Sequence, residues 1–399
     1  MFKVIRQYFK ATDKLYLLLC AGCSLFSVIV LVSIGRFQLG GFTYDSVSGA
    51  VVGMGGYSKA IVQAAASLLG ILCAIVLSSF DYHDIVKIWP LHAAVTWGLV
   101  LPTLFLHNVK LGPVTIGFDA GGTDNYSWYK IAGFTLQPAE LAKISFILTF
   151  ALHLDRVRDR INEPAELAKL LLHMLAPVAL IHLQGDDGTA IIFMCIGCMM
   201  LFSAGISWHY ILGAGAAVLS AAAIVVGFFR DRVFKSYQFA RIMAVIYPDD
   251  PAYATYTYQQ NKGVISIGSG KIIGQGLFNE VHNIVPNAWN DFIFSYMAES
   301  IGFVGCMVVL AALFAIAFKT LSTGLRSEDH TGSYICVGIF GALFFQLVIN
   351  LGMNLQILPV IGVTLPFFSA GGSSVLMLYL SVGIVLSVYM HNKKTIFDN

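Results

Sequence analysis

The sequence predicts an all-α membrane protein in which about ten helices cross the bilayer. Of its 399 residues, 57% are hydrophobic and only 12% are charged, and the mean hydropathy is +0.76. A soluble globular protein carries about 25% charged residues, so this chain has half the expected charge. Its apolar residues also come in long runs, which is the pattern of membrane-spanning segments. The formal net charge of +2 gives no field that would favour nucleic acid.

The individual spans follow from the length of the apolar runs, because about 20 apolar residues cross the hydrocarbon layer. The fifth and sixth spans are short, and the break between them is polar. We expect one membrane domain over residues 1–399, with a large loop on the outer side over about 230–291. The predicted spans are 15–35, 59–80, 86–106, 138–155, 167–183, 188–206, 209–229, 292–318, 334–352 and 373–391.

The orientation follows from the Lys and Arg residues of the short connections, which gather on the cytoplasmic side of a membrane protein. Only four lie in the short loops of one side, at Arg36, Lys59, Lys110 and Lys130. The basic residues of the other side include the N-terminal Lys3, Arg6, Lys10 and Lys14 and the C-terminal Lys393 and Lys394. Both termini of this multi-pass protein are therefore expected in the cytoplasm, and the long loop is expected outside, in the periplasm or at the cell exterior.

The long loop ends at Asp291, where polar sequence meets an apolar span. A carboxylate there should be exposed enough to ionise, yet close enough to the bilayer to meet a lipid-borne substrate. Upstream lie Arg241, Lys262 and a glycine-rich run over 263–276. The run lacks the Gly-x-x-x-x-Gly-Lys-Ser/Thr of a P-loop, so we expect tight turns whose N–H groups could line an anion site. The alternative is that Asp291, or Asn290, caps the next helix.

Ionisable residues at two other helix starts are also functional candidates, since a charge in a membrane helix costs about 2.5–3.5 kcal/mol on insertion scales. Glu140 and Lys143 lie three residues apart and share a helix face. They form either a structural ion pair or part of a site for an anionic head group. Asp186 and Asp187 open the sixth span, where carboxylates complement the helix dipole.

Glu299 lies about two helical turns beyond Asp291, roughly 12 Å along the helix. The two carboxylates are too far apart to share a proton or a metal ion, so we expect them to have separate roles. Farther on, residues 358–374 contain prolines and glycines that cannot form a regular membrane helix. Non-helical backbone at this depth must be buried or line a cavity. This predicts a substrate groove, with candidate contacts at Ser369, Gly371 and Gly372.

Taken in order, these motifs resemble the SEDS family of bacterial membrane glycosyltransferases, which includes RodA, FtsW and SpoVE. The resemblance covers most of the chain. It rests on Gln-Pro-Ala-Glu-Leu-Ala-Lys at 137–143, on 184–190, on Tyr258 with Ile-Gly-Ser-Gly at 267–270, on Asp-Phe-Ile-Phe at 291–294 with Glu299, and on 358–374. The short motif at 267–270 and the lack of a long C-terminal tail are more similar to the RodA, elongation-type branch.

The sequence departs from the family pattern at several motif positions. The family commonly has Leu-Pro-Glu-x-His-Thr before its aspartate, where this chain has Val-Pro-Asn-Ala-Trp-Asn at 285–290. A second glutamate is replaced by Ser300, the Gln-Pro-Asp pattern becomes Gln-Gly-Asp at 184–186, and a tyrosine is replaced by Ala370. These differences bear on substrate detail and rate more than on family membership.

The resemblance implies an inverting glycosyltransferase in which Asp291 is the catalytic base and the substrate is lipid II, an undecaprenyl pyrophosphate-linked disaccharide peptide. It also implies a class B penicillin-binding protein transpeptidase as partner. Arg241, Lys262 and Lys143 are candidates to stabilise the departing pyrophosphate. Substrate contacts are also expected at Glu140 and Glu299. The sequence requires no cofactor but leaves room for a divalent cation, Mg²⁺ or Mn²⁺.

Two other functions compete with polymerisation. A flippase for lipid-linked precursors could use the membrane-embedded Glu140 and Lys143 together with the broken segment at 358–374. A transporter, however, needs its key charges at mid-membrane, whereas Asp291 is predicted in an outer loop. The third function is that of a non-catalytic activator of the transpeptidase.

Overall fold

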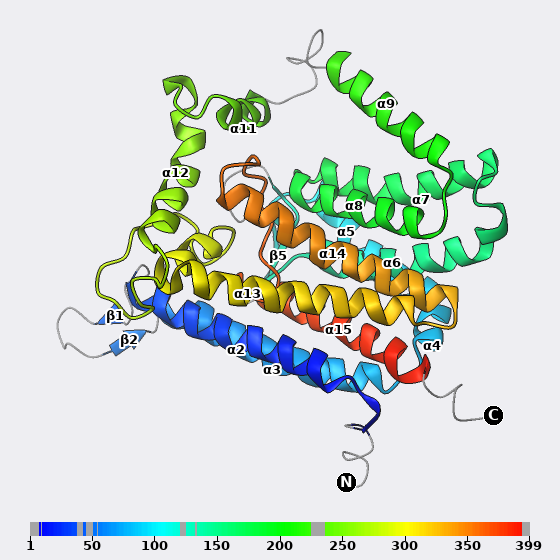
Figure 1. Ribbon diagram of the computed structural model, residues 1–399, viewed down its shortest axis with the longest axis horizontal. Helices are drawn as coiled ribbons and strands as arrows, with labels where there is room; N and C mark the ends of the chain where they lie inside the picture. Colours follow the sequence, from blue (N-terminus) through cyan, green and yellow to red (C-terminus); the bar gives the residue numbers. More distant parts are fainter. Residues whose placement is uncertain are drawn as a thin grey trace.

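The computed structural model describes residues 8, 10–37, 43–44, 51–53, 55–119, 125–131, 134–224 and 236–392, and it is a bundle of long helices (Figure 1). Six of the described helices are long and apolar enough to cross a membrane, which confirms the predicted all-α polytopic fold. They are α2 (Lys14–Phe37), α3 (Ser58–Ser78), α7 (Pro164–Leu183), α13 (Ile293–Leu325), α14 (His330–Asn354) and α15 (Gly372–Asn392).

The other predicted spans also coincide with helices, namely α5 (Trp89–Phe105), α6 (Pro138–Val157), α8 (Asp187–Ser203) and α9 (Trp208–Ile224). Residues 225–229 of the span predicted over 209–229 lie outside the described residues. The predicted end of α13 at 318 is wrong, because the helix continues to Leu325. Lys319 lies inside this helix, and its charge is paired, because its Nζ atom lies 2.7 Å from Asp13 Oδ2.

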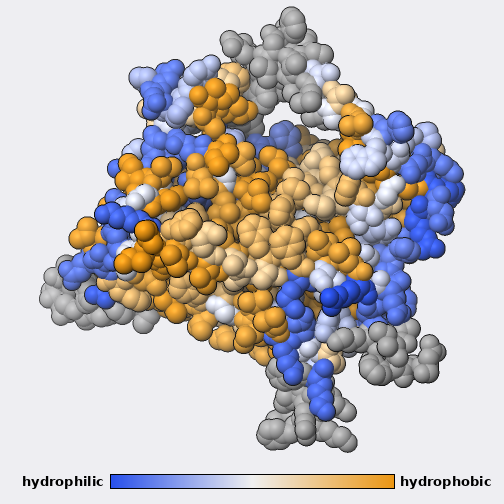
Figure 2. Space-filling view, viewed as in Figure 1, coloured by the Kyte–Doolittle hydropathy of each residue, from blue (hydrophilic) through white to orange (hydrophobic). Residues whose placement is uncertain are grey.

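The surface carries a broad hydrophobic band across the middle of the bundle, with hydrophilic side chains gathered toward its two ends (Figure 2). The start of α2 and the end of α15 lie at one end of the bundle (Figure 1). Helix α12 (Ala254–Ser269) stands at the opposite end. This arrangement is that of a bundle with one apolar belt and two polar faces, as a membrane protein requires.

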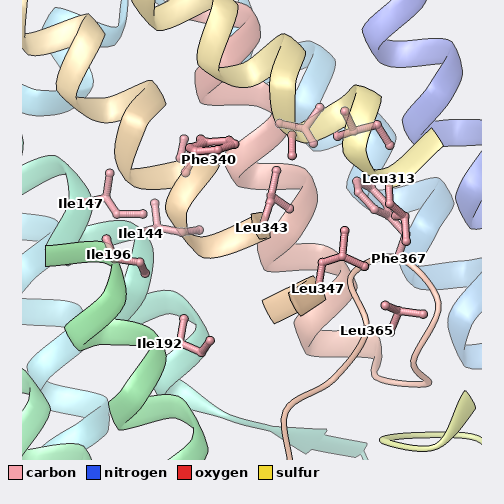
Figure 3. Close-up of a cluster of buried hydrophobic side chains, with 14 of the residues drawn as sticks. Ile144, Ile147, Ile192, Ile196, Leu313, Phe340, Leu343, Leu347, Leu365 and Phe367 are labelled. Carbon is pink, nitrogen blue, oxygen red and sulfur yellow. The ribbon is translucent and has the colours of Figure 1, made fainter. Parts of the chain in front are cut away.

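The interior is packed with apolar side chains from α6, α8, α13 and α14 (Figure 3). Ile147 of α6, Ile196 of α8 and Leu343 of α14 are each at most 5% exposed. Leu365 and Phe367 from the broken segment reach the same cluster. The irregular backbone is therefore anchored in the core by its own apolar side chains.

A small antiparallel sheet fills the connection before α6, where the sequence predicted only a loop. Its strands pair in the order β3 (Val109–Leu111), β4 (Val114–Phe118), β5 (Trp128–Ile131) and β6 (Phe134–Leu136). A separate two-stranded sheet joins β1 (Thr43–Tyr44) and β2 (Val51–Gly53). Most of these strands have only two to four residues, which is too short to show the alternating pattern that predicts strands.

The long outer loop contains two helices, α11 (Ser236–Ile246) and α12, so the prediction of turns throughout its glycine-rich run is wrong in part. Gly263 lies inside α12. A Cβ atom on Gly270 would lie 1.9 Å from the carbonyl oxygen of Ala298, so this glycine allows close contact with α13. Gly274 and Gly276 have φ of 82° and 98° and do form the predicted turns.

Helix α13 is interrupted at Gly302, where φ is 69° and ψ is −174°. The backbone groups around the break pair with residues 271–276 of the outer loop. Gln275 N–H donates to the Glu299 carbonyl at 2.8 Å, and Phe303 N–H donates to the Lys271 carbonyl at 2.9 Å. The loop is thus fastened to the membrane helix through the main chain of both partners.

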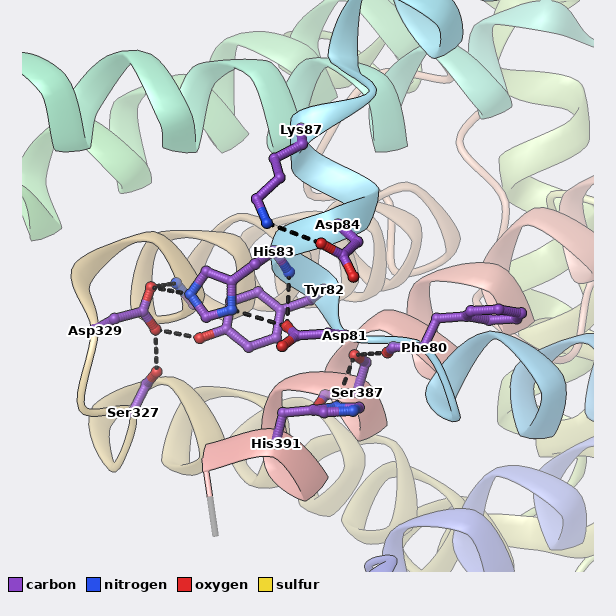
Figure 4. Close-up of polar contacts among 11 residues, drawn as sticks. Phe80, Asp81, Tyr82, His83, Asp84, Lys87, Ser327, Asp329, Ser387 and His391 are labelled. Carbon is purple, nitrogen blue, oxygen red and sulfur yellow. Dashed lines mark hydrogen bonds and ion pairs between the residues drawn. The ribbon is translucent and has the colours of Figure 1, made fainter. Parts of the chain in front are cut away.

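A polar cluster ties together the turns at the end of the bundle opposite α12 (Figure 4). The His83 ring lies 2.8 Å from Asp81 Oδ1 through Nδ1 and 3.4 Å from Asp329 Oδ2 through Nε2. Asp329 also accepts hydrogen bonds from Tyr82 and Ser327. These contacts join α4 (Tyr82–Lys87) to the turn between α13 and α14.

Candidate active site

Asp291 lies in the turn before α13 and is only 9% exposed. The N-cap of α13 is Phe292, which makes no side-chain capping bond. Neither Asp291 nor Asn290 is the N-cap, so the capping alternative is wrong. Asp291 Oδ1 has no hydrogen-bond partner among the described residues. This carboxylate is therefore buried with one oxygen unpartnered.

The environment of Asp291 favours its protonated form. Burial raises the pKa of Asp291 from its ordinary value of 3.8 to about 6, although the positive charge of Arg241 lowers it and Asp186 raises it further. The sequence predicted a carboxylate exposed enough to ionise, whereas the structure leaves it only 9% exposed, because the segment between α14 and α15 folds over it. A carboxylate with this pKa is still ionised at neutral pH and is a stronger base than an exposed one.

The segment that covers Asp291 is the broken segment between α14 and α15. A Cβ atom on Gly362, whose φ is 76°, would lie 3.8 Å from Asp291 Oδ2. The Ala370 N–H donates to the Trp289 carbonyl at 2.8 Å. The prediction that this segment is non-helical is confirmed over the residues between the two helices. Because it lies against the turn that carries Asp291, it closes one side of the site.

Three residues of this segment were predicted to contact substrate, and their contacts in the fold are structural. Ser369 Oγ donates to the Asn290 carbonyl at 2.8 Å. Gly371 N–H donates to Gln63 Oε1 at 3.3 Å. A Cβ atom on Gly372 would lie 2.9 Å from a methyl group of α3. These contacts hold the segment in place, and contact with substrate stays a prediction for all three.

Glu140 and Lys143 form an ion pair at the start of α6, with 2.9 Å between Oε1 and Nζ. Their side chains are 12% and 8% exposed, so the predicted pairing on one helix face is confirmed. Both line a small, partly open pocket between α6, α14, α15 and the broken segment. Ile147, Leu343 and Leu378 supply apolar walls farther along it. The pocket therefore has one charged pair and a largely apolar lining.

Asp186 is the N-cap of α8, since its Oδ1 accepts a hydrogen bond from Thr189 N–H at 3.1 Å. This confirms the capping interpretation. Gln137 Nε2 and Ser127 Oγ also donate to its Oδ2. Burial raises its pKa. No sequence pattern indicated that Asp186 would lie within electrostatic range of Asp291.

Glu299 is fully buried and faces the outer loop. Its Oε1 accepts two bonds from Asn283, from the backbone N–H at 2.8 Å and from Nδ2 at 3.1 Å. Ser266 donates to Oε2. Glu299 therefore fixes the loop to α13, and the expectation that it acts apart from Asp291 fits this placement. Its predicted contact with substrate is not supported by a side chain with 0% exposure.

The two loop cations are placed differently. Arg241 of α11 donates from Nη1 to the Val360 carbonyl at 3.1 Å, beside the segment that covers Asp291. Lys262 of α12 lies over the ring of Tyr258, 5.9 Å from its centroid. Arg241 is thus brought to the site by tertiary structure, whereas Lys262 lies along the outer helix.

Comparison with known proteins identifies the family. A family model described as a cell cycle protein, FtsW/RodA/SpoVE, matches residues 14–394. The chain belongs to the FtsW/RodA/SpoVE family. A family member named Probable peptidoglycan glycosyltransferase FtsW, from Geobacter sp. (strain M18), is 30% identical over 330 residues, which are 82% of this chain and 85% of the relative.

A second member is Peptidoglycan glycosyltransferase MrdB of Escherichia coli (strain K12). It is 32% identical over 297 residues, which are 73% of this chain and 78% of the relative. Relatives of both names thus match at similar identity. The predicted family and the enzyme class of peptidoglycan glycosyltransferase are confirmed.

Solved structures of the family share the fold. The crystal structure of the rod shape determining protein RodA of Thermus thermophilus has a TM-score of 0.61 and 26% identity, and the match covers 95% of this chain and 96% of RodA. A chain from a peptidoglycan synthase complex that coordinates polymerization and crosslinking has a TM-score of 0.72 at 24% identity, covering 96% and 98% of the two chains. The latter likeness concerns the fold alone.

Proposed function

We propose that this chain polymerises lipid II at the outer face of the cytoplasmic membrane by inverting glycosyl transfer, with Asp291 as the general base. The observation that carries this proposal is the buried carboxylate with an unpartnered oxygen and a pKa of about 6. A general base contributes about 10²–10⁴ in rate when its pKa lies near the working pH. Asp291 has this property because the fold buries it without neutralising it.

In the proposed reaction, Asp291 takes the proton of the acceptor sugar's 4-hydroxyl while that oxygen attacks the anomeric carbon of the donor. The bond to undecaprenyl pyrophosphate breaks, and the pyrophosphate leaves with the electron pair. Attack from the face opposite the leaving group inverts the configuration. A pyrophosphate is a stable anion, so the step needs no general acid, and one carboxylate suffices.

The pocket beside Glu140 and Lys143 supports a place for the lipid-linked substrate. Its charged pair lies at the start of α6, whereas most of its lining is apolar. We assign the pyrophosphate to the vicinity of Lys143 and the prenyl chain to the apolar wall. Arg241, which lies beside the segment over Asp291, supplies a second positive charge, within electrostatic range of the base. Stabilisation of the departing anion is often the largest contribution to catalysis.

We propose no resident metal ion for the site. Among the described residues, no three His, Cys, Asp or Glu side chains come together in a way that could hold one. The proposal therefore uses no step through a protein-bound metal. Whether a divalent cation accompanies the pyrophosphate stays a prediction.

The partner and cellular role also belong to the proposal. We place the chain with a class B penicillin-binding protein transpeptidase, in a RodA-like role in cell elongation, with both termini in the cytoplasm. The fold it shares with a chain of a peptidoglycan synthase complex supports the partner. The start of α2 and the end of α15 lie at the same end of the bundle (Figure 1), which supports the placement of both termini on one side of the membrane. One membrane domain, with its catalytic loop over about 230–291, serves this role.

The test is a polymerisation assay with the purified chain, a class B transpeptidase and lipid II in the presence of Mg²⁺ or Mn²⁺. Wild type should form glycan chains, and Asp291→Asn should lose at least about 100-fold in rate. Asp187→Asn, a change at a partly exposed carboxylate, is the matched control and should stay active. Polymerisation by Asp291→Asn at the wild-type rate would refute the base. If neither the wild type nor the variants polymerise lipid II, but the wild type moves lipid II across vesicle membranes, the flippase function holds. Activation of the transpeptidase without either activity would indicate the scaffold.

A further inference from the structure

Two asparagines on α14 lie directly beneath the turn that carries Asp291. Asn350 and Asn354 are one helical turn apart, so their side chains leave the same face of the helix. Both are completely buried. A buried carboxamide is costly unless its donors and acceptor are paired, so the bonds that these side chains make determine what they do.

Asn354 lies at the turn just before the first hydrogen bond of α13, in which the Tyr296 N–H donates to the Phe292 carbonyl at 3.4 Å. If the helix began one residue earlier, the Ser295 N–H would donate to the Asp291 carbonyl. Here Asn354 Nδ2 donates to the Asp291 carbonyl at 2.9 Å, and Asn354 Oδ1 accepts from Ser295 N–H at 3.2 Å. Ser295 Oγ also donates to this oxygen, at 2.7 Å. The Ser295 N–H also donates to the Phe292 carbonyl, at 3.1 Å. The side-chain amide of Asn354 thus links the Asp291 carbonyl, just outside the helix, to the first turn of α13.

Asn350 connects the same carbonyl to the opposite wall of the site. Its Nδ2 donates to the Asp291 carbonyl at 2.9 Å and to the Val363 carbonyl at 2.8 Å. Val363 follows Gly362, the residue that faces Asp291 Oδ2. Helix α14 therefore sets the position of Asp291 and also that of the backbone near Gly362, which faces the Asp291 carboxylate.

We propose that Asn350 and Asn354 are positioning residues for glycosyl transfer, which hold the Asp291 carboxylate at its working distance from the acceptor by fixing its main chain. This inference rests on the proposed role of Asp291 as base. The two amides restrain Asp291 without donating to its carboxylate. A donor on the carboxylate itself would stabilise the ionised form and weaken the base, whereas a donor on the backbone fixes its place and leaves that oxygen open.

The test compares Asn350→Ala and Asn354→Ala with wild type in the polymerisation assay with the transpeptidase partner. Both variants should lose about 10- to 100-fold in kcat, since misplacement by about 1 Å costs a reaction about this much, while KM for lipid II changes less than about twofold. The matched control is Gln260→Ala. Gln260 is equally buried and also anchors this region, through the Met353 and Leu358 carbonyls, at 3.0 and 2.8 Å from its Nε2. Gln260→Ala should lower the melting temperature but should lose much less kcat than the two Asn variants.

A double mutant separates positioning from general destabilisation. If Asn354 acts through Asp291, adding Asn354→Ala to Asp291→Asn should cause no further loss in rate. If the rate loss of the double mutant equals the product of the two single losses, the positioning role is overturned. It is also overturned if kcat falls no more in the two Asn variants than in Gln260→Ala. Wild-type rates for Asp291→Asn would instead overturn the proposed base, so the two failures are distinguishable.

A second variant covers the case in which the alanine variants do not fold. Asn354→Asp keeps the volume and the acceptor for Ser295 but loses the donor to Asp291. Its kcat should fall about 10- to 100-fold while KM for lipid II changes less than about twofold. A wild-type kcat, or an equal change in kcat and KM, would overturn the inference.

Discussion

The unpartnered burial of Asp291 predicts that this residue lowers stability at neutral pH. Raising the pKa of the carboxyl from 3.8 to about 6 corresponds to about 3 kcal/mol against the ionised form. The folded pKa is above the unfolded one, so this penalty is complete above about pH 6 and is relieved as the pH falls toward 4. Replacing Asp291 by Asn removes the charge at constant volume. The unpaired amide costs about 1 kcal/mol, which leaves a net gain of about 2 kcal/mol at pH 8.

The assay is a thermal melt of wild type and Asp291→Asn in detergent at pH 5 and pH 8, combined with polymerisation rates from pH 5 to 8. Asp291→Asn should melt higher than wild type at pH 8, and the difference should shrink at pH 5. The wild-type rate should fall about tenfold for each pH unit below about 6, because only ionised Asp291 accepts a proton. Equal melting temperatures at pH 8, or a flat rate profile across pH 6, would refute the reasoning.

Three further predictions concern the scaffold. Lys143→Met should destabilise the protein by about 3–5 kcal/mol in thermal melts, because it leaves Glu140 charged, only 12% exposed and without its partner. The double change with Glu140→Gln should recover much of this loss, and equal melting temperatures of the single and double variants would contradict the prediction. Gly302→Ala should abolish monodisperse elution from a sizing column. The new Cβ would lie 2.2 Å from a backbone nitrogen of the outer loop, and the φ of 69° at this position disfavours any side chain. Gly22→Ala is the control and should elute normally, because nothing lies within 4 Å of its Cβ. Burial alone would raise the pKa of Asp81, but the hydrogen bonds and charge of His83 outweigh burial and lower this pKa below its ordinary value of 3.8. The contact therefore stabilises the fold above pH 3.8 and is lost as the pH falls below that value. Hydrogen exchange of α4 should show acid-induced opening below pH 3.8 in wild type and much less pH dependence in His83→Ala.

The membrane helices could be predicted from the sequence because hydrocarbon thickness imposes one length on every apolar run. The outer helices α11 and α12 could not, since no bilayer sets their length and α12 contains the glycines that suggested turns. Gly270 shows why the glycine signal was ambiguous: it serves a close approach to the Ala298 carbonyl, which depends on α13 farther along the chain. The same composition predicts a turn or a tight contact, and only the fold decides between them.

The site was predictable in part. Motifs pointed to Asp291, and helix spacing paired Glu140 with Lys143. The burial of Asp291 was not predictable, because the wall over it comes from residues around Gly362, and the donors beneath it come from α14. Spacing along the chain says nothing of such contacts. Glu299 was assigned to substrate for the same reason, although its three donors all come from the outer loop.

A base of this kind faces two opposing requirements, and the fold meets them with different groups. To be basic near neutral pH, the carboxylate of Asp291 must be buried and kept from strong donors, which leaves it poorly held. To act on one hydroxyl, it must be held in one place. The structure restrains the residue through its carbonyl, by Asn350 and Asn354, and leaves Oδ1 without a partner among the described residues. Because the restraint acts on the main chain, it need not lower the basicity of the carboxylate, and α14 can fix the geometry without weakening the chemistry.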